Sequence, residues 1–126
     1  MHALIIEDEI LLALAMEDAL AKLGYVTFDI TASMDQAIKA AENQCPDLVV
    51  ADHQIVDGTG TEAVLAICSE KPIPVVFVTG SALEVRKRLP DALIVSKPFA
   101  TAELETAIDT AAKSPLQLGP GGHRFR

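Results

Sequence analysis

The chain has 126 residues and is 50% hydrophobic, which suits a single domain that buries roughly two-thirds of its unfolded surface. Its formal net charge of −8 comes without a basic stripe, and this argues against nonspecific binding to nucleic acid. No apolar run is long enough to span a membrane, and Met1 leads directly into a predicted strand. We therefore expect a cytoplasmic protein that has no membrane partner.

The first half of the chain alternates short apolar runs with segments of helical periodicity. The pattern predicts strands over 3–6 and 25–31 and helices over 10–23 and 33–43. Gly24 is well placed to end the first helix. Ser33 and Gln36 match a capping box, in which each side chain satisfies a free amide at the start of a helix.

The second half continues this alternation around one apolar strand. Residues 48–51 form a strand that stops at Asp52, and a polar, glycine-rich stretch then predicts a loop over 53–60. The later predicted elements are a helix over 62–69, a strand over 75–78, a short helix over 81–89, a strand over 92–95 and a helix over 102–113. Residues 114–126 are rich in glycine and proline without periodicity, which predicts a flexible tail.

The regular alternation of strands and helices predicts an α/β fold with a parallel sheet and right-handed crossovers. We therefore expect one domain over 1–113, followed by the flexible tail over 114–126. In open parallel sheets, ligands bind outside the carboxyl ends of the strands. Residues that follow the predicted strands are thus the first candidates for function.

Four of the five predicted strands are followed by a residue with metal or phosphate chemistry. These residues are, in chain order, Glu7 and Asp8, then Asp52, Thr79 and Lys97. Clustered carboxylates repel one another, so Glu7, Asp8 and Asp52 together indicate a hard divalent cation, most simply Mg²⁺. A carboxylate nucleophile, a cation, an ammonium and a hydroxyl are the groups needed to receive and hold a phosphoryl group.

The predicted helix over 10–23 has more apolar residues than one buried stripe needs. Leu11, Leu14 and Ala15 lie off that stripe. They indicate a docking face for a partner protein, and the alternative that they pack beneath flanking loops stays open.

Cysteine and histidine give no further site. Cys45 and Cys68 lack the spacing of a metal site, and in a domain with cytoplasmic character we expect free thiols rather than a disulfide. The three histidines, His2, His53 and His123, share no ligand spacing either, and we interpret His53 as a loop residue.

These strand-end residues give the chain a resemblance to the receiver domain of two-component response regulators. The matching residues are Glu7 and Asp8, Asp52 with Asp57, Gly58 and Gly60, Thr79 with Gly80, and Lys97 with Pro98 and Phe99. The resemblance covers residues 3–113. It implies a doubly wound five-stranded parallel sheet of strand order 2-1-3-4-5 with five flanking helices, of which the fourth is short or atypical here.

The resemblance implies that Asp52 is the phosphoacceptor. Glu7 and Asp8 would hold Mg²⁺ together with Asp52, and Gln54 would add its backbone carbonyl. The phosphoryl donor would be a sensor histidine kinase or a histidine phosphotransfer protein, and a downstream protein would read the phosphorylated state. Such a domain carries one phosphoryl group and is not a multi-turnover enzyme.

Further roles follow from the same resemblance. Thr79 would bind the incoming phosphoryl group, Lys97 would pair with it, and the Lys97–Pro98 peptide bond would be cis. Gln54 and Ser81 each lie two positions beyond a site residue and flank the route of a hydrolytic water. We predict that they tune the lifetime of the phosphoryl group.

The sequence departs from the family pattern at three places. Ile55 and Val56 stand where the family often has methionine and proline. Ile94 stands where an aromatic residue usually lies, which predicts that Thr79 does not couple to a phenol hydroxyl. The segment that follows Thr79 is shorter than usual, which predicts a reshaped fourth helix. Residues 77–80 resemble the Phe-Ala-Thr-Gly run of a subgroup of stand-alone receivers.

The sequence argues against three alternatives to the receiver interpretation. An aspartate-nucleophile phosphatase favours a second aspartate where this chain has Gln54, so turnover should be lacking. A nucleotide-binding module needs a glycine-rich first turn, whereas residues 7–9 are acidic. A non-phosphorylated interaction module of receiver ancestry is disfavoured because every site residue is present.

Overall fold

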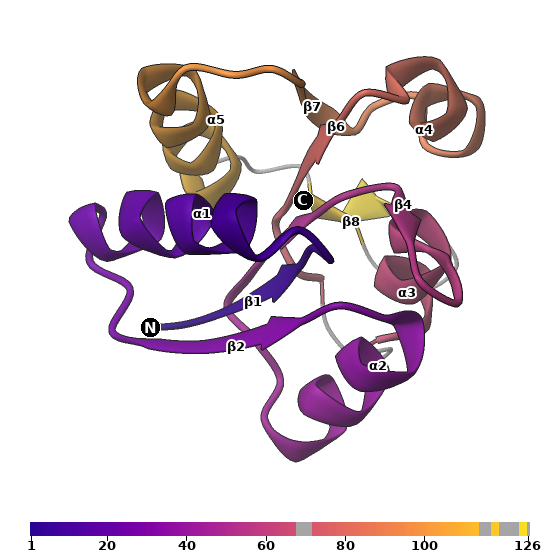
Figure 1. Cartoon of the computed structure of the whole chain (residues 1–126), viewed down its shortest axis with the longest axis horizontal. Helices are drawn as coiled ribbons and strands as arrows, with labels where there is room; N and C mark the ends of the chain where they lie inside the picture. The colour runs from indigo at the N-terminus through magenta and orange to yellow at the C-terminus, as the bar shows by residue number, and fades with distance from the viewer. Residues whose placement is uncertain (68–71, 114–116, 119–123, 126) are drawn as a thin grey trace.

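The computed structural model describes residues 1–67, 72–113, 117–118 and 124–125, and its centre is a five-stranded parallel sheet with helices on both faces (Figure 1). The strands are β1 His2–Ile6, β2 Thr27–Thr31, β3 Leu48–Ala51, β6 Val75–Thr79 and β7 Leu93–Ser96. They lie in the order β2-β1-β3-β6-β7, and every neighbouring pair is parallel. This confirms the doubly wound sheet and its strand order, since β6 and β7 are the fourth and fifth strands of the sheet along the chain.

The three central strands are buried on both faces, which explains why they read as continuous apolar runs. No residue of β1, β3 or β6 is exposed. Alternate side chains enter opposite cores, so Leu4 and Ile6 join one core while Ala3 and Ile5 join the other. The edge strands β2 and β7 have partly exposed side chains.

The helices form one layer on each face of the sheet. On one face α1 Ile10–Lys22 packs beside α5 Thr101–Lys113, and on the other α2 Met34–Asn43 packs beside α3 Gly60–Ala66 (Figure 1). Helix α4, Ala82–Arg88, has seven residues, which confirms the short fourth helix. Its buried Val85 joins the core beneath α2 and α3. None of the described helices combines the length and apolar character needed to cross a membrane.

The predicted helix signals act as expected. Gly24 has φ +100°, the left-handed conformation that glycine adopts readily, and its amide donates to the carbonyl of Ala21 (3.1 Å). At the start of α2, Ser33 Oγ accepts from the amide of Gln36 (3.1 Å). In return, Gln36 Oε1 accepts from the amide of Ala32 (2.8 Å), one residue before the expected partner.

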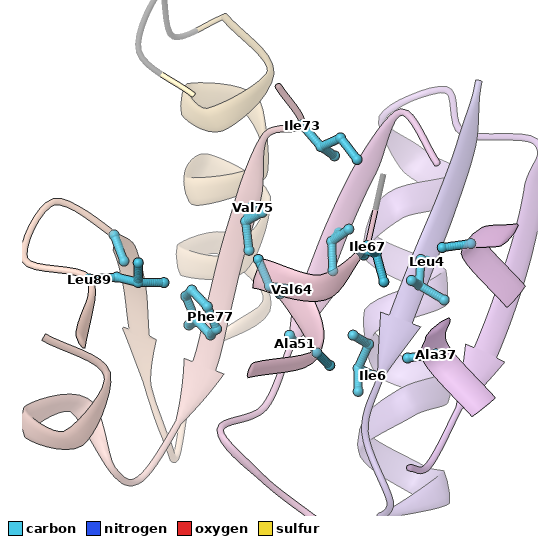
Figure 2. Packing of buried hydrophobic residues seen from close by; sticks show 14 of the residues in the cluster. Leu4, Ile6, Ala37, Ala51, Val64, Ile67, Ile73, Val75, Phe77 and Leu89 are labelled. Carbon is cyan, nitrogen blue, oxygen red and sulfur yellow. The ribbon is translucent and has the colours of Figure 1, made fainter. Parts of the chain in front are cut away.

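The core on the α2 and α3 face fills the space beneath the strand ends. Figure 2 shows side chains of three adjacent strands meeting there, among them Ile6, Ala51 and Phe77. Among the residues whose burial the structure describes, Phe77 has the largest fully buried side chain. Ile6 and Ala51 each immediately precede a candidate site residue, so this packing fixes where the chain leaves the sheet.

The expected strand over 25–31 begins late, at Thr27. Its neighbour β1 starts at His2, which pairs with Thr27. Before that pair, the amide of Val26 donates to the carbonyl of Met1 (3.1 Å). Tyr25 instead enters the core and is 4% exposed.

The hydroxyl of Tyr25 is buried and has no hydrogen-bond partner among the residues that the structure describes. Burial raises the pKa of this phenol, and the charges of Asp47 and Asp109 raise it further. Tyr25 lies just before the amino end of β2, at the edge of the sheet opposite the candidate site.

The expected loop over 53–60 contains a small antiparallel hairpin of β4 Gln54–Ile55 and β5 Gly58–Thr59. Helix α3 starts two residues earlier than expected because the hydroxyl of Thr59 caps it, accepting from the amide of Glu62 (3.1 Å). The predicted end of this helix, residues 68–69, lies outside the described residues. In the tail, β8 Gln117–Leu118 pairs with β9 Arg124–Phe125. The flexibility of the tail stays a prediction.

The expectation of free thiols is wrong for Cys45, which is disulfide-bonded. Cys68, the other cysteine of the sequence, lies outside the described residues. The free-thiol prediction rested on the cytoplasmic character of the composition, because disulfides are uncommon in that compartment. Composition could not indicate that α2, which ends just before Cys45, packs beside α3.

Candidate functional site

The candidate residues are positioned by hydrogen bonds that continue the sheet beyond its strands. The amide of Asp52 donates to the carbonyl of Ile6 (2.8 Å), and the amide of Lys97 donates to that of Thr79 (3.0 Å). The amide of Glu7 donates in the same way to the last residue of β2 (2.8 Å). Each residue is therefore fixed at the carboxyl edge by the strand beside its own.

Lys97 joins two carboxylates that are far apart in the sequence. Its Nζ lies 2.8 Å from Glu7 Oε1 and 2.9 Å from Asp52 Oδ2. The Glu7 side chain is fully buried, that of Asp52 is 11% exposed and that of Lys97 is 20% exposed. The expected convergence of these residues is thus present as an ion cluster that is largely shielded from water.

The cluster changes the acid–base properties of its members. Burial raises the pKa of Glu7 above its ordinary value of 4.5, and the hydrogen bonds from Lys97 and from the Glu9 amide offset only part of that effect. Burial also disfavours the ammonium of Lys97, but its hydrogen bonds to Glu7 and Asp52, together with their charges, raise its pKa overall. Lys97 therefore keeps its positive charge, whereas burial disfavours the negative charge of the Glu7 carboxylate.

The carboxylates are arranged as they would be to share a cation. One oxygen each from Glu7, Asp8 and Asp52 lies within 4.8 Å of the others, and Asp8 is the exposed member. Three carboxylates face one ammonium, so the charge of Lys97 does not balance the group. Oxygen donors that are close together and carry excess negative charge suit a hard divalent cation.

Thr79 lies at the end of β6 and is 1% exposed. Its hydroxyl oxygen accepts a hydrogen bond from the amide of Ser81 (2.9 Å). A hydroxyl that accepts in this way can still donate its own proton to another oxygen. Gln54 is exposed on β4, and among the described residues no hydrogen bond links its side chain to the ion cluster.

Comparison with known proteins gives this site a family. Residues 3–109 match the response regulator receiver domain. The chain belongs to this family. It is 33% identical over 112 residues to the phyllosphere-induced regulator PhyR of Methylorubrum extorquens, a match that covers 86% of this chain and 42% of PhyR. It is 31% identical over 114 residues to the transcriptional regulatory protein PdtaR of Mycobacterium tuberculosis, covering 87% of this chain and 56% of PdtaR.

Solved receiver structures agree. The receiver domain of Erythrobacter litoralis PhyR superposes with a TM-score of 0.80 at 33% identity, covering 90% of this chain and 93% of that domain. A Bartonella quintana PhyR mutant, described as an anti-anti-sigma factor, superposes with a TM-score of 0.79 at 29% identity, covering 88% of this chain and 48% of that protein. The chain spans about half the length of the curated relatives it matches.

The receiver domain has an apolar surface on α1. Leu11 is 79% exposed, Leu14 is 48% exposed, Ile10 is 62% exposed, and Ala15 is exposed as well. The alternative that Leu11, Leu14 and Ala15 pack beneath flanking loops is therefore wrong. Since α1 begins three residues after Glu7, this surface adjoins the ion cluster.

Two further features of this receiver domain concern the segments beside the site. The Lys97–Pro98 bond is cis, as the resemblance implied. Asp57 has a contact that the sequence did not indicate. Its carboxylate caps α2, accepting from the amides of Met34 (2.5 Å) and Asp35 (3.2 Å). A helix cap supplied from a later loop leaves no local sequence signal, so only the family motif pointed to Asp57.

Proposed function

We propose that this receiver domain accepts a phosphoryl group on Asp52 in a Mg²⁺-dependent reaction and then changes how it binds a partner protein. The observation that carries the proposal is the ion cluster, in which the ammonium of Lys97 is hydrogen-bonded to Glu7 and Asp52 at the carboxyl edge of the sheet. A buried nucleophilic carboxylate with a fixed cation beside it can receive a phosphoryl group and hold the resulting charge.

The donor in this proposal is a phosphohistidine on a sensor histidine kinase or a histidine phosphotransfer protein. A carboxylate oxygen of Asp52 bonds to phosphorus, the phosphorus–nitrogen bond breaks in line with it, and the electron pair of that bond stays on the imidazole. Lys97 pairs with the transferred oxygens, and the hydroxyl of Thr79 donates to one of them. The product is an acyl phosphate on Asp52.

The residues that would hold Mg²⁺ are Glu7, Asp8 and Asp52, with the backbone carbonyl of Gln54 as a further ligand. Bound there, the ion would supply positive charge to the oxygens of the transferred group. The excess of carboxylates over ammonium groups supports this assignment.

Phosphorylation is read in this proposal through the segment after Thr79. When the Thr79 side chain rotates to bring its hydroxyl to a phosphoryl oxygen, the hydroxyl moves away from the Ser81 amide, that hydrogen bond is lost, and the chain that leads into α4 shifts. Ile94, on β7 beside Phe77, offers no phenol hydroxyl for the usual coupling. The downstream partner is a protein, and the domain works in the cytoplasm as a carrier of one phosphoryl group rather than as an enzyme.

Intact mass spectrometry after incubation with acetyl phosphate tests the proposal. We expect wild type to gain a single phosphoryl group with Mg²⁺ and none with a chelator, and Asp52→Ala to gain none. An adduct of equal yield on Asp52→Ala, or no adduct on wild type, would contradict it. The variants Gln54→Ala and Ser81→Ala, phosphorylated in the same way and followed over time, test whether these residues tune the lifetime of the phosphoryl group. Loss of the phosphoryl group at the wild-type rate in both variants would contradict that role.

A further inference from the structure

The first two residues of α3 hold the residue that follows Asp52. The amide of Gly60 donates to the carbonyl of His53 (2.7 Å). The hydroxyl of Thr61 shares a hydrogen bond with Nδ1 of the His53 ring (2.9 Å), and Thr61 is 1% exposed. The start of α3 is therefore hydrogen-bonded to both the backbone and the side chain of His53.

His53 passes this contact on to the candidate phosphoacceptor. Its amide donates to Asp52 Oδ1 (2.7 Å), while Lys97 holds the other carboxylate oxygen, Oδ2 (2.9 Å). The carboxylate is thus held on two sides. The Lys97 contact is made by a side chain, whereas the His53 contact is made by a backbone amide of a residue that α3 holds.

The fit between α3 and Asp52 is close. A Cβ added to Gly60 would lie 1.7 Å from the backbone oxygen of Asp52, so any other residue would force these two segments apart. The start of α3 therefore packs directly against the backbone at the end of β3. The hydroxyl of Thr61 is the only side-chain group in the described structure that links the His53 ring to the start of α3.

We propose that Thr61 is a positioning residue for Asp52, acting through His53. The Thr61 hydroxyl holds the His53 ring and the Gly60 amide holds the His53 carbonyl. These two contacts restrain the backbone angles of His53, and the restrained amide on the other side of its Cα sets the direction in which Asp52 Oδ1 points. Thr61 thereby sets the rate at which the carboxylate accepts a phosphoryl group. This inference rests on the proposed function, and the matching residues of the receiver family include neither Thr61 nor His53.

The test compares Thr61→Val with Thr61→Ser in the full chain. Valine replaces the hydroxyl by a methyl of similar size, whereas serine keeps the hydroxyl. The first readout is the rate of phosphorylation by acetyl phosphate with Mg²⁺, followed by intact mass. We expect Thr61→Val to be roughly fivefold slower, which is the effect of about one hydrogen bond, and Thr61→Ser to stay close to wild type.

The second readout is the amide signal of His53 in a proton–nitrogen correlation spectrum of the unphosphorylated protein. A short hydrogen bond to a carboxylate shifts an amide proton downfield, so the signal should move upfield in Thr61→Val and stay in place in Thr61→Ser. His53→Leu should lower the phosphorylation rate as Thr61→Val does. The double variant should be no slower than either single variant, because both changes interrupt one connection.

Each outcome decides the inference. A wild-type rate or an unmoved His53 signal in Thr61→Val overturns it, and so does an equal loss of rate in the valine and serine variants, which would indicate packing alone. If wild type takes no phosphoryl group, the proposed function fails. The connection from Thr61 to Asp52 is then decided by the His53 signal alone.

Discussion

Glu7 is a buried residue whose charge its surroundings disfavour. Its pKa in the folded domain lies above the ordinary 4.5, mainly because burial removes its carboxylate from water. A raised carboxyl pKa contributes stability that is complete below pH 4.5 and is lost as the pH rises through the folded-state value. At neutral pH the metal-free domain therefore holds an unfavourable charge that a bound cation would offset.

We predict that Glu7→Gln raises the stability of the metal-free domain at neutral pH and lowers the further gain on adding Mg²⁺. Glutamine resembles the protonated form of Glu7 that burial favours. The measurement is urea unfolding with a chelator and with Mg²⁺. Asp8→Asn is the matched control: Asp8 is exposed, so this change should lower the Mg²⁺ gain while raising metal-free stability less than Glu7→Gln does. A less stable metal-free Glu7→Gln domain would contradict the prediction.

At the scale of elements, helix α2 depends on a side chain supplied from outside the helix. The Asp57 carboxylate binds two amides of its first turn, and these bonds lower the pKa of Asp57 below its ordinary 3.8. A lowered carboxyl pKa contributes stability that is present above pH 3.8 and is lost as the pH falls through the folded-state value. Because Asp57 lies in the turn between β4 and β5, the cap also links this hairpin, which follows Asp52, to α2.

We predict that Asp57→Ala lowers the melting temperature at neutral pH, and that the difference from wild type shrinks as the solution is acidified below pH 3.8. Thermal unfolding followed by circular dichroism over this pH series measures it. Asp57→Asn keeps an oxygen acceptor without the charge and should fall between the two at neutral pH. A difference that stays constant down to the lowest pH would show that the Asp57 charge has no part in the cap.

The elements differed in how far the sequence determined them. The central strands could be predicted because burial on both faces produces an uninterrupted apolar run, and α2 could be predicted because Ser33 and Gln36 cap it locally. The hairpin of β4 and β5 could not, since strands of two residues have no periodicity. The start of β2 was misplaced because it depends on where its neighbour β1 begins.

Considered as a whole, the molecule places its apolar α1 surface next to its ion cluster. Ile10, Leu11 and Leu14 are exposed on the helix that starts directly after the acidic residues. A donor protein bound there would bring its phosphohistidine to Asp52. A small phosphodonor such as acetyl phosphate would reach Asp52 without this surface.

We predict that Leu11→Ser and Leu14→Ser slow phosphotransfer from a histidine kinase that phosphorylates wild type, by roughly tenfold if docking loses about 1.4 kcal/mol. Phosphorylation by acetyl phosphate should be unchanged. Leu83→Ser is the control, since Leu83 is 76% exposed on α4 and outside this surface. Equal slowing with both donors would mean that the substitutions damage the site instead of docking.

The candidate site was largely predictable because its residues follow successive strands, and the carboxyl ends of parallel strands meet at one edge. That rule alone predicts that Glu7, Asp52 and Lys97 lie together. It could not indicate that His53 and Thr61 contact each other, because this contact depends on how α3 is seated on β3. The disulfide at Cys45 was missed for the same kind of reason.

Tyr25 gives the molecule a built-in optical reporter. It is the single tyrosine of a chain without tryptophan. Fluorescence excited at wavelengths that phenylalanine does not absorb therefore comes from this one buried ring. That ring lies at the amino edge of the sheet, while phosphoryl chemistry is proposed for the carboxyl edge. Its emission therefore follows unfolding of the core at a distance from Asp52, and the stability of each variant can be measured without a label that would disturb the site.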